Sequence, residues 1–166
     1  VTEDRRGEGI VPLMSVGSNI TLPVLDQISK AGWINQKEDQ KIAQEYVNKL
    51  QIKTPSVEQN IGNLSGGNQQ KCCIAKWLAT YPKIIILDEP TKGIDIGAKE
   101  EIHKIVDQLV REKYAVIMIS SELPEIIGAC DHIIVMYEGK ISGTFGSQET
   151  EITQDLLMTS AAGIQS

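Results

Sequence analysis

The hydrophobic and polar positions in the first half of the chain follow a helical repeat. Over residues 15–55 the apolar residues fall on two stripes, the first with Leu22, Leu25 and Ile28 and the second with Ile42, Tyr46, Val47 and Leu50. This pattern predicts two helices. Asn35, followed three residues later by Glu38, has the pattern of a capping box, so the second helix is expected over about residues 36–50.

A third helix is predicted to start within residues 64–71, Leu-Ser-Gly-Gly-Asn-Gln-Gln-Lys. Ser65 is a suitable N-cap, and one side of the following helical repeat is apolar, with Cys73, Trp77, Leu78 and Tyr81. Two glycines leave the first N–H groups without side-chain cover, and the positive end of the helix dipole adds to these donors. The site therefore suits a phosphate, although an ordinary capped helix is the alternative interpretation.

The second half of the chain has the pattern of an α/β unit. Four consecutive apolar residues, 84–87, predict a parallel strand buried on both faces, and Asp88 and Glu89 follow at its carboxyl end. Ligands bind at this edge of such sheets. One carboxylate can hold Mg²⁺ and its neighbour can polarise a water for attack on a phosphoryl group, whereas a solvated strand end is the alternative.

The remaining segments extend this unit. An amphipathic helix is predicted over residues 97–113 and a second buried strand over residues 115–119, which together with the first strand make a βαβ unit. A short helix begins near Pro124, residues 133–137 and 141–145 form a hairpin, and a last helix covers about residues 153–158.

Composition narrows the function classes. A chain of 166 residues suits one core, and its net charge of -6 disfavours a nucleic-acid partner because phosphate contacts need a basic patch. Cys72, Cys73 and Cys130 have neither a disulfide nor a metal-ligand spacing, and are expected to be reduced, half-buried residues. No apolar run approaches the length of about 18 residues that a membrane span requires.

Taken together, residues 64–71 and 83–91 resemble the signature motif and the Walker B strand of the ATP-binding-cassette (ABC) ATPases. Residues 91–95, Thr-Lys-Gly-Ile-Asp, stand where that family has its D-loop, and Ser120-Ser121-Glu122 stand where it has its switch residue. The spellings of these motifs are most similar to the second half of the tandem ATPase subunits of bacterial monosaccharide importers of the ribose, galactose and xylose type.

This resemblance implies an α/β fold: a partial RecA-like P-loop NTPase core with a helical sub-lobe. Residues 1–166 would be the C-terminal part of one ABC ATPase domain, with about 15–81 as the helical lobe and about 82–166 as part of the α/β core. ATP and Mg²⁺ are the implied cofactors, with Asp88 as the metal ligand and Glu89 and Ser121 as catalytic residues. The implied nucleotide-binding residues are Ser65, Gly66, Gly67, Asn68, Gln69, Glu3 and Asp95.

Several family features are altered or missing. Glu3 takes the place of the Q-loop glutamine and Ser121 that of the switch histidine, and a hydroxyl cannot supply imidazole's acid–base capacity. The phosphate loop, Gly-x4-Gly-Lys-Ser/Thr, is absent from the sequence. We therefore expect a C-terminal fragment of a longer subunit, which by itself binds Mg-ATP negligibly and does not hydrolyse it.

The resemblance implies the ATP-hydrolysing subunit of a sugar importer at the cytoplasmic face of a bacterial membrane. Its expected partners are the other nucleotide-binding domain of the same or a paired subunit, the membrane permeases and, indirectly, a periplasmic or extracellular sugar-binding protein; nucleic acid is not expected. Two alternatives stay open: a non-catalytic half that completes and regulates a partner's ATP site, and a non-transport ABC-type ATPase. The sequence does not indicate which sugar is carried.

Overall fold

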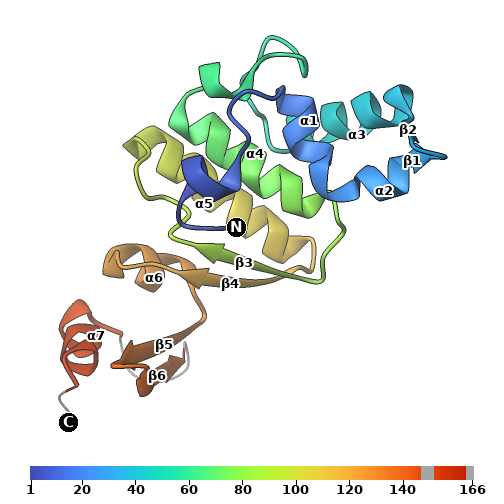
Figure 1. Ribbon diagram of the computed structural model, residues 1–166. Coiled ribbons are helices and arrows are strands. Elements are labelled where there is room, and N and C mark those ends of the chain that lie inside the picture. The colour runs from blue at the N-terminus through green and yellow to red at the C-terminus, as the bar shows by residue number, and fades with distance from the viewer. Residues whose placement is uncertain (147–151, 164–166) are drawn as a thin grey trace. The chain divides into compact units, whose positions relative to one another are not determined.

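The computed structural model describes residues 1–146 and 152–163 of the chain. They belong to two compact units, Val1–Ile119 and Ser120–Ser166. Residues 147–151 and 164–166, which fall in the predicted α/β part, lie outside the described residues. In the larger unit, helices lie over one face of a two-stranded sheet (Figure 1).

The first part of the larger unit is mostly helical. In chain order its elements are the π-helical turn η1 (Arg5–Gly9), α1 (Val16–Thr21), the 3-10 turn η2 (Leu22–Val24), α2 (Leu25–Ile28), the strands β1 (Ser29–Lys30) and β2 (Trp33–Ile34), α3 (Gln36–Lys49), the 3-10 turn η3 (Ile61–Asn63) and α4 (Gly66–Leu78). The second predicted helix is confirmed as α3, and Asn35 caps it by accepting the Glu38 N–H at 3.4 Å.

The prediction of one continuous first helix is wrong. Pro23 lies at the start of η2, where it removes a backbone donor and its ring clashes with the preceding turn, so the segment divides into α1, η2 and α2. The division changes which side chains face inward. Val24 and Ile28 are buried, whereas Leu22 and Leu25 of the predicted stripe are only half-buried.

α4 begins where the sequence predicts, but its predicted apolar side is only partly right. Cys73 and Leu78 are buried, while Trp77 and Tyr81 are 42% and 65% exposed. The reason is that α4 packs against α1, α3, α5 and η1 and is therefore covered on several sides, so that even Lys71 in its middle is buried. No single stripe describes such a helix.

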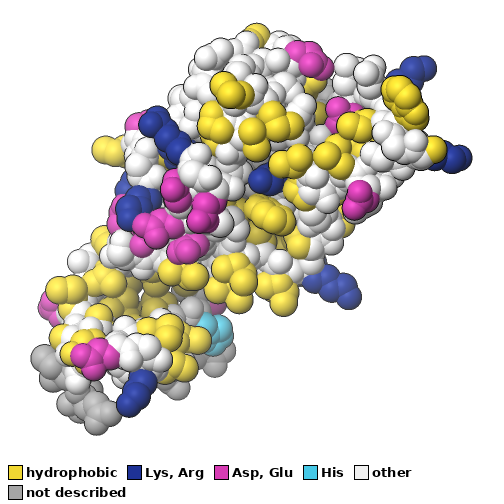
Figure 2. All heavy atoms as spheres, viewed as in Figure 1, with side chains coloured by type: hydrophobic (Ala, Val, Ile, Leu, Met, Phe, Trp, Pro, Cys, Tyr) yellow, Lys and Arg dark blue, Asp and Glu magenta, His cyan; other side chains and the backbone are white. Residues whose placement is uncertain are grey.

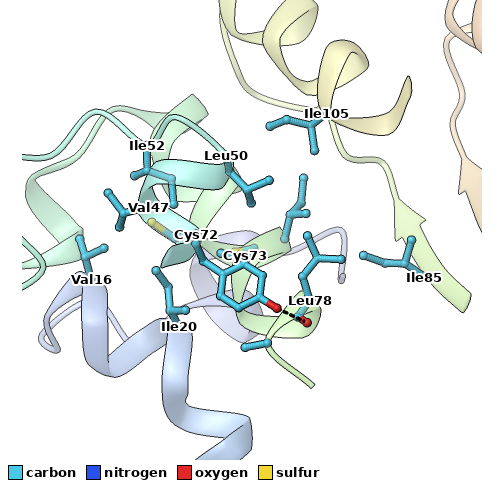
Figure 3. Packing of buried hydrophobic residues seen from close by; sticks show 14 of the residues in the cluster. Val16, Ile20, Val47, Leu50, Ile52, Cys72, Cys73, Leu78, Ile85 and Ile105 are labelled. Carbon is cyan, nitrogen blue, oxygen red and sulfur yellow. Dashed lines mark hydrogen bonds between the residues drawn. The ribbon is translucent and has the colours of Figure 1, made fainter. Parts of the chain in front are cut away.

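The core of the larger unit forms where α1, α3 and α4 meet. Val16, Ile20, Val47, Leu50 and Ile52 close around the two cysteines of α4 (Figure 3). Tyr46 enters this core and its hydroxyl donates to the Leu78 carbonyl at 2.7 Å, which satisfies the one polar atom that the ring brings inside. Cys72 and Cys73 are free and fully buried, deeper than the sequence predicts.

The predicted βαβ unit is confirmed. β3 (Ile84–Asp88) pairs in parallel with β4 (Ala115–Ile119), in a register that sets Ile84 beside Ala115 and Asp88 beside Ile119. The connection is α5 (Ile96–Arg111), whose residues Ile102, Ile105, Val106 and Leu109 face the core.

The prediction that β3 is buried on both faces is wrong for the described residues. Ile85 and Leu87 point into the core, but Ile84 and Ile86 on β3 and Ile117 and Ile119 on β4 are about half exposed. Figure 2 shows hydrophobic side chains gathered along this surface, over β3 and β4. The helices of the larger unit cover the opposite face, which leaves an apolar sheet surface.

The smaller unit contains α6 (Leu123–Ala129), the antiparallel strands β5 (His132–Tyr137) and β6 (Lys140–Gly146), and α7 (Gln154–Ala161), which packs on both strands. The predicted hairpin is confirmed, with Glu138 and Gly139 at positive φ in a two-residue turn. In neither unit do the described helices reach the combined length and apolarity of a membrane span.

Candidate functional site

The first turn of α4 presents backbone donors that no side chain caps. Ser65 occupies the N-cap position with an extended backbone, as predicted, but its side chain makes no capping bond. Its hydroxyl instead accepts from the Asn68 side-chain amide at 2.9 Å, and the Asn68 carbonyl oxygen accepts the Lys53 N–H at 2.8 Å. The N–H groups at the start of α4 are therefore open to an anion.

The same turn is pressed against the segment that follows β3. A Cβ on Gly66 would lie 3.5 Å from Cγ2 of Ile94, and a Cβ on Gly67 would lie 2.5 Å from Cβ of Ala98. Only glycine allows this approach at Gly67. Asp95 caps α5 by accepting the Ala98 N–H at 2.9 Å, so this predicted nucleotide-binding residue already holds the helix that lies beside the first turn of α4.

Gln69 does not lie at the open end of α4. Its side chain is buried, and its amide nitrogen donates to the Ile61 carbonyl at 3.2 Å, which holds the turn η3 against the helix. Asn68 is likewise occupied by Ser65 and Lys53. Of the five predicted residues at 65–69, the structure thus leaves Ser65, Gly66 and Gly67 to face an incoming group.

Asp88 and Glu89 lie at the carboxyl end of β3, as predicted. Asp88 is the last residue of the strand, and Glu89 turns the chain with a φ of 44°, donating its N–H to the Ile119 carbonyl at 2.8 Å. Both side chains are half-buried. A non-glycine residue at positive φ is uncommon, and here it turns the chain directly after the strand.

Glu3 reaches the same edge from the start of the chain. The Val1 carbonyl accepts the Asp88 N–H at 3.1 Å, and the Glu3 carboxylate pairs with the Lys92 ammonium at 2.5 Å. The pKa of Lys92 is raised, mainly by the hydrogen bond with Glu3 and the negative charge of Glu3, and further by the charges of Glu89 and Asp88. The structure therefore places a cation near the two strand-end carboxylates, which the sequence interpretation missed.

Ser121 belongs to the smaller unit, where it is exposed. Its neighbour Ser120 accepts the Glu122 N–H at 3.0 Å and donates its hydroxyl to Glu125, so this residue fixes the turn into α6. The structure brings together the predicted residues Glu3, Asp88 and Glu89 within the larger unit. Ser121 belongs to the other unit.

An ion pair between the buried Lys71 and the partly exposed Glu101 ties α4 to α5. The Lys71 side chain is 3% exposed, and its ammonium lies 2.8 Å from Glu101 Oε2 and donates to the Gln51 carbonyl at 3.0 Å. Lys53 pairs with the other Glu101 oxygen at 3.0 Å, and the two lysines lower the pKa of Glu101 to about 2. This network holds the helix that begins at the open amides against the helix that Asp95 caps.

The donor set at the end of β3 fits a magnesium ion that is shared with a phosphate ligand. Among the described residues no three His, Cys, Asp or Glu side chains converge as a complete metal site. Asp88 and Glu89 offer one or two carboxylates, and Mg²⁺ is usually held by that number together with substrate phosphates and water. The buried Thr91 hydroxyl nearby in sequence has no hydrogen-bond partner within the described part of the chain.

The open amides at the start of α4 and the two acids at the carboxyl end of β3 lie at the two motifs for which the sequence resembles the ABC ATPases. The chain belongs to the ABC transporter family, whose sequence model matches residues 3–92. That match covers both α4 and the end of β3.

Curated relatives match nearly the whole chain. It is 52% identical to the xylose import ATP-binding protein XylG of Thermoanaerobacter pseudethanolicus over 98% of its length. It is 48% identical to the ribose import ATP-binding protein RbsA of Roseobacter denitrificans over 99%. In both comparisons the chain spans 32% of the relative's own length, about a third.

Solved structures confirm the fold. The chain is similar to MJ1267, an ATP-binding cassette of an ABC transporter, with 26% identity and a TM-score of 0.74 over 92% of this chain and 64% of that one. It also resembles the dimeric cassette MJ0796, with 24% identity and a TM-score of 0.73 over 88% of this chain and 61% of that one. The predicted fold class, a partial ABC ATPase core with a helical lobe, is confirmed.

Proposed function

We propose that this chain is the C-terminal part of one ATPase domain in a sugar ABC importer, and that the subunit couples ATP binding and hydrolysis to transport. The observation that carries the proposal is the uncapped first turn of α4, which close packing against Ala98 and the Lys71–Glu101 ion pair hold in place. The names of the relatives, which import xylose and ribose, support the substrate class.

The two groups of site residues have different tasks in this proposal. Ser65, Gly66 and Gly67 present a hydroxyl and amides to the γ-phosphate of an ATP molecule that another nucleotide-binding domain holds. Asp88 ligates Mg²⁺, which when bound neutralises phosphate charge, and Glu89 polarises the attacking water. Asn68 and Gln69 act by holding the turn in shape, because their side chains are already hydrogen-bonded within the chain.

The two composite ATP sites of such an assembly are unequal in this proposal. The first turn of α4 is intact, whereas Glu3, which stands at the Q-loop position of the sequence, is tied to Lys92, and a serine, Ser121, stands at the switch position of the sequence. A second candidate function follows from the same ion pair. Lys92 pairs with Glu3, and the hydrogen bond and charge of Glu3, followed by the charges of Glu89 and Asp88, raise its pKa. A cation therefore already lies near the two acids, and in this second proposal the half serves mainly to complete the partner's site.

The proposed partners are those implied by the resemblance to sugar importers. They are a second nucleotide-binding domain, the membrane permeases, which the helical lobe of residues 15–81 meets, and indirectly a sugar-binding protein. The proposed location is the cytoplasmic face of the bacterial membrane. The half-exposed isoleucines of β3 and β4 support the view that this unit is a part of a larger domain, since solvent-facing sheets normally carry polar residues.

The test uses the subunit that carries this chain, reconstituted in vesicles with its permeases. We expect steady-state ATP hydrolysis that rises when sugar-loaded binding protein is present on the opposite face, together with sugar uptake. ATP hydrolysis that ignored the binding protein and sugar would support a non-transport ATPase and would contradict the importer proposal.

A further inference from the structure

The guanidinium of Arg5 lies against the first turn of α4. Its Nη2 is 3.2 Å from the position that a Cβ on Gly66 would occupy. Its Nε is enclosed by protein and has no hydrogen-bond partner among residues 1–146 and 152–163, whereas Arg5 as a whole is half-buried. An arginine carries five N–H donors, and a buried donor without a partner costs about 1–3 kcal/mol.

The electrostatic surroundings of Arg5 favour an anion. The positive end of the α4 dipole and the Arg5 cation stand next to each other, which is unfavourable unless a negative group lies near both. Burial lowers the pKa of the Arg5 guanidinium, the Cys73 thiol raises it and Arg6 lowers it further. Within the described part of the chain, Arg5 has no ion-pair partner.

Arg5 is fixed to the same helix that presents the open amides. Asp4 caps the turn η1 by accepting the Gly7 N–H at 2.8 Å, and Gly9 packs so closely that a Cβ there would lie 2.9 Å from Cys73 Sγ. Lys76 of α4 donates to the Gly9 carbonyl at 3.2 Å. The guanidinium and the first turn of α4 are therefore held together as one group of donors.

We infer that Arg5 is a further phosphate-binding residue of the site at the start of α4, where its guanidinium donates to the terminal phosphate of a nucleoside triphosphate. The inference rests on the proposed function. Arg5 would add a charged donor to a site that otherwise has backbone amides and one hydroxyl. Because the proposed function brings the terminal phosphate to this end of α4, the inference predicts a preference for the triphosphate over the diphosphate.

The test compares Arg5→Gln with Arg6→Gln in the full-length subunit assembled with its partners. Arg6 follows Arg5 in the same turn and is exposed, so the two variants match in charge and position. Binding is measured for a non-hydrolysable ATP analogue and for ADP. Because hydrogen bonds to charged groups are the strong ones, Arg5→Gln should weaken analogue binding about tenfold or more and change ADP binding by less than about twofold.

Arg6→Gln should leave both affinities unchanged, and Arg5→Lys should keep part of the preference for the triphosphate. Equal losses for the analogue and ADP in Arg5→Gln, or no difference from Arg6→Gln, would overturn the inference. Thermal melting of each variant tests for a purely structural role of Arg5. A lower melting temperature of Arg5→Gln with an unchanged triphosphate preference would also contradict the inference that Arg5 binds phosphate. Failure of the unsubstituted subunit to bind the analogue would instead contradict the proposed function.

Discussion

Gly67 and Ala98 hold the first turns of α4 and α5 in contact: a Cβ on Gly67 would lie 2.5 Å from the Ala98 Cβ. Real Cβ atoms do not approach so closely, so the contact exists only because residue 67 is glycine. Gly67 is thus needed for packing between helices as well as for open amides, and the same residue serves the fold and the proposed site.

We predict that Gly67→Ala separates the two helices. The added methyl group must push α4 from α5, and overpacking of this kind costs about 1–3 kcal/mol of unfolding free energy. The matched control is Gly97→Ala in the first turn of α5, where a Cβ would meet only Asp95 Oδ1 at an ordinary 3.5 Å. Urea unfolding should show a loss for the first variant and none for the second, and equal stabilities would contradict the close contact.

The buried ammonium of Lys71 should matter more than the exposed one of Lys53. Lys71→Met removes a donor from the Gln51 carbonyl and from Glu101, and hydrogen bonds to charged groups are worth about 1.5–3 kcal/mol. Lys53→Met, which removes the exposed partner of the same carboxylate, should cost less than about 1 kcal/mol. Chemical denaturation distinguishes the two, and a larger loss for Lys53→Met would show that the pair is not organised as described.

Stability should fall in acid partly through Glu101. Hydrogen bonds from Lys71 and Lys53 lower its pKa to about 2 in the folded chain, well below the value of about 4.3 expected when unfolded. The folded state therefore gains stability from this carboxylate above about pH 4.3 and loses it as the pH falls toward about 2. Solvent screening reduces the effect, since the side chain is 37% exposed.

Glu101→Gln removes this pH dependence. The unfolding free energy, measured by urea titration at about pH 6 and about pH 3.5, should fall less in Glu101→Gln than in the unsubstituted chain. Glu100→Gln is the control, because Glu100 is the exposed neighbour on the same helix. An identical acid loss in all three proteins would exclude Glu101 as a source of the dependence.

Elements that depend on local sequence were predictable. Asn35 and Glu38 mark the start of α3, and the acids after four apolar residues mark the end of β3. The apolar stripe of residues 15–55 does not indicate the division at Pro23, because the period of apolar residues continues through the proline that interrupts the helix. The prediction that β3 is buried on both faces was wrong, because an apolar run does not indicate whether residues of the same chain cover both faces of the strand.

Contacts between distant segments were not predictable from patterns. Glu3 and Lys92 are 89 positions apart, and neither position shows a local sign of the ion pair. Lys71 is the last residue of the signature motif and is a buried cation, and no local sequence pattern indicates that Arg5 lies against the first turn of α4. The two glycines at 66 and 67 were the one sequence signal of these contacts. Close packing requires their lack of side chains as much as an approaching phosphate does.

The central claim is that the start of α4 serves a working ATP site and that the Asp88 side serves a weaker one. The most direct measurement is steady-state ATP hydrolysis by the assembled transporter with Ser65→Arg or Glu89→Gln in the subunit that carries this chain. The arginine would fill the space where the γ-phosphate meets the open amides, so Ser65→Arg should abolish turnover. Glu89→Gln should leave a substantial part of it, whereas loss of an activating group at a working site costs about 10²-fold or more. An equal fall in both variants would contradict the account and would make the Asp88 side fully catalytic.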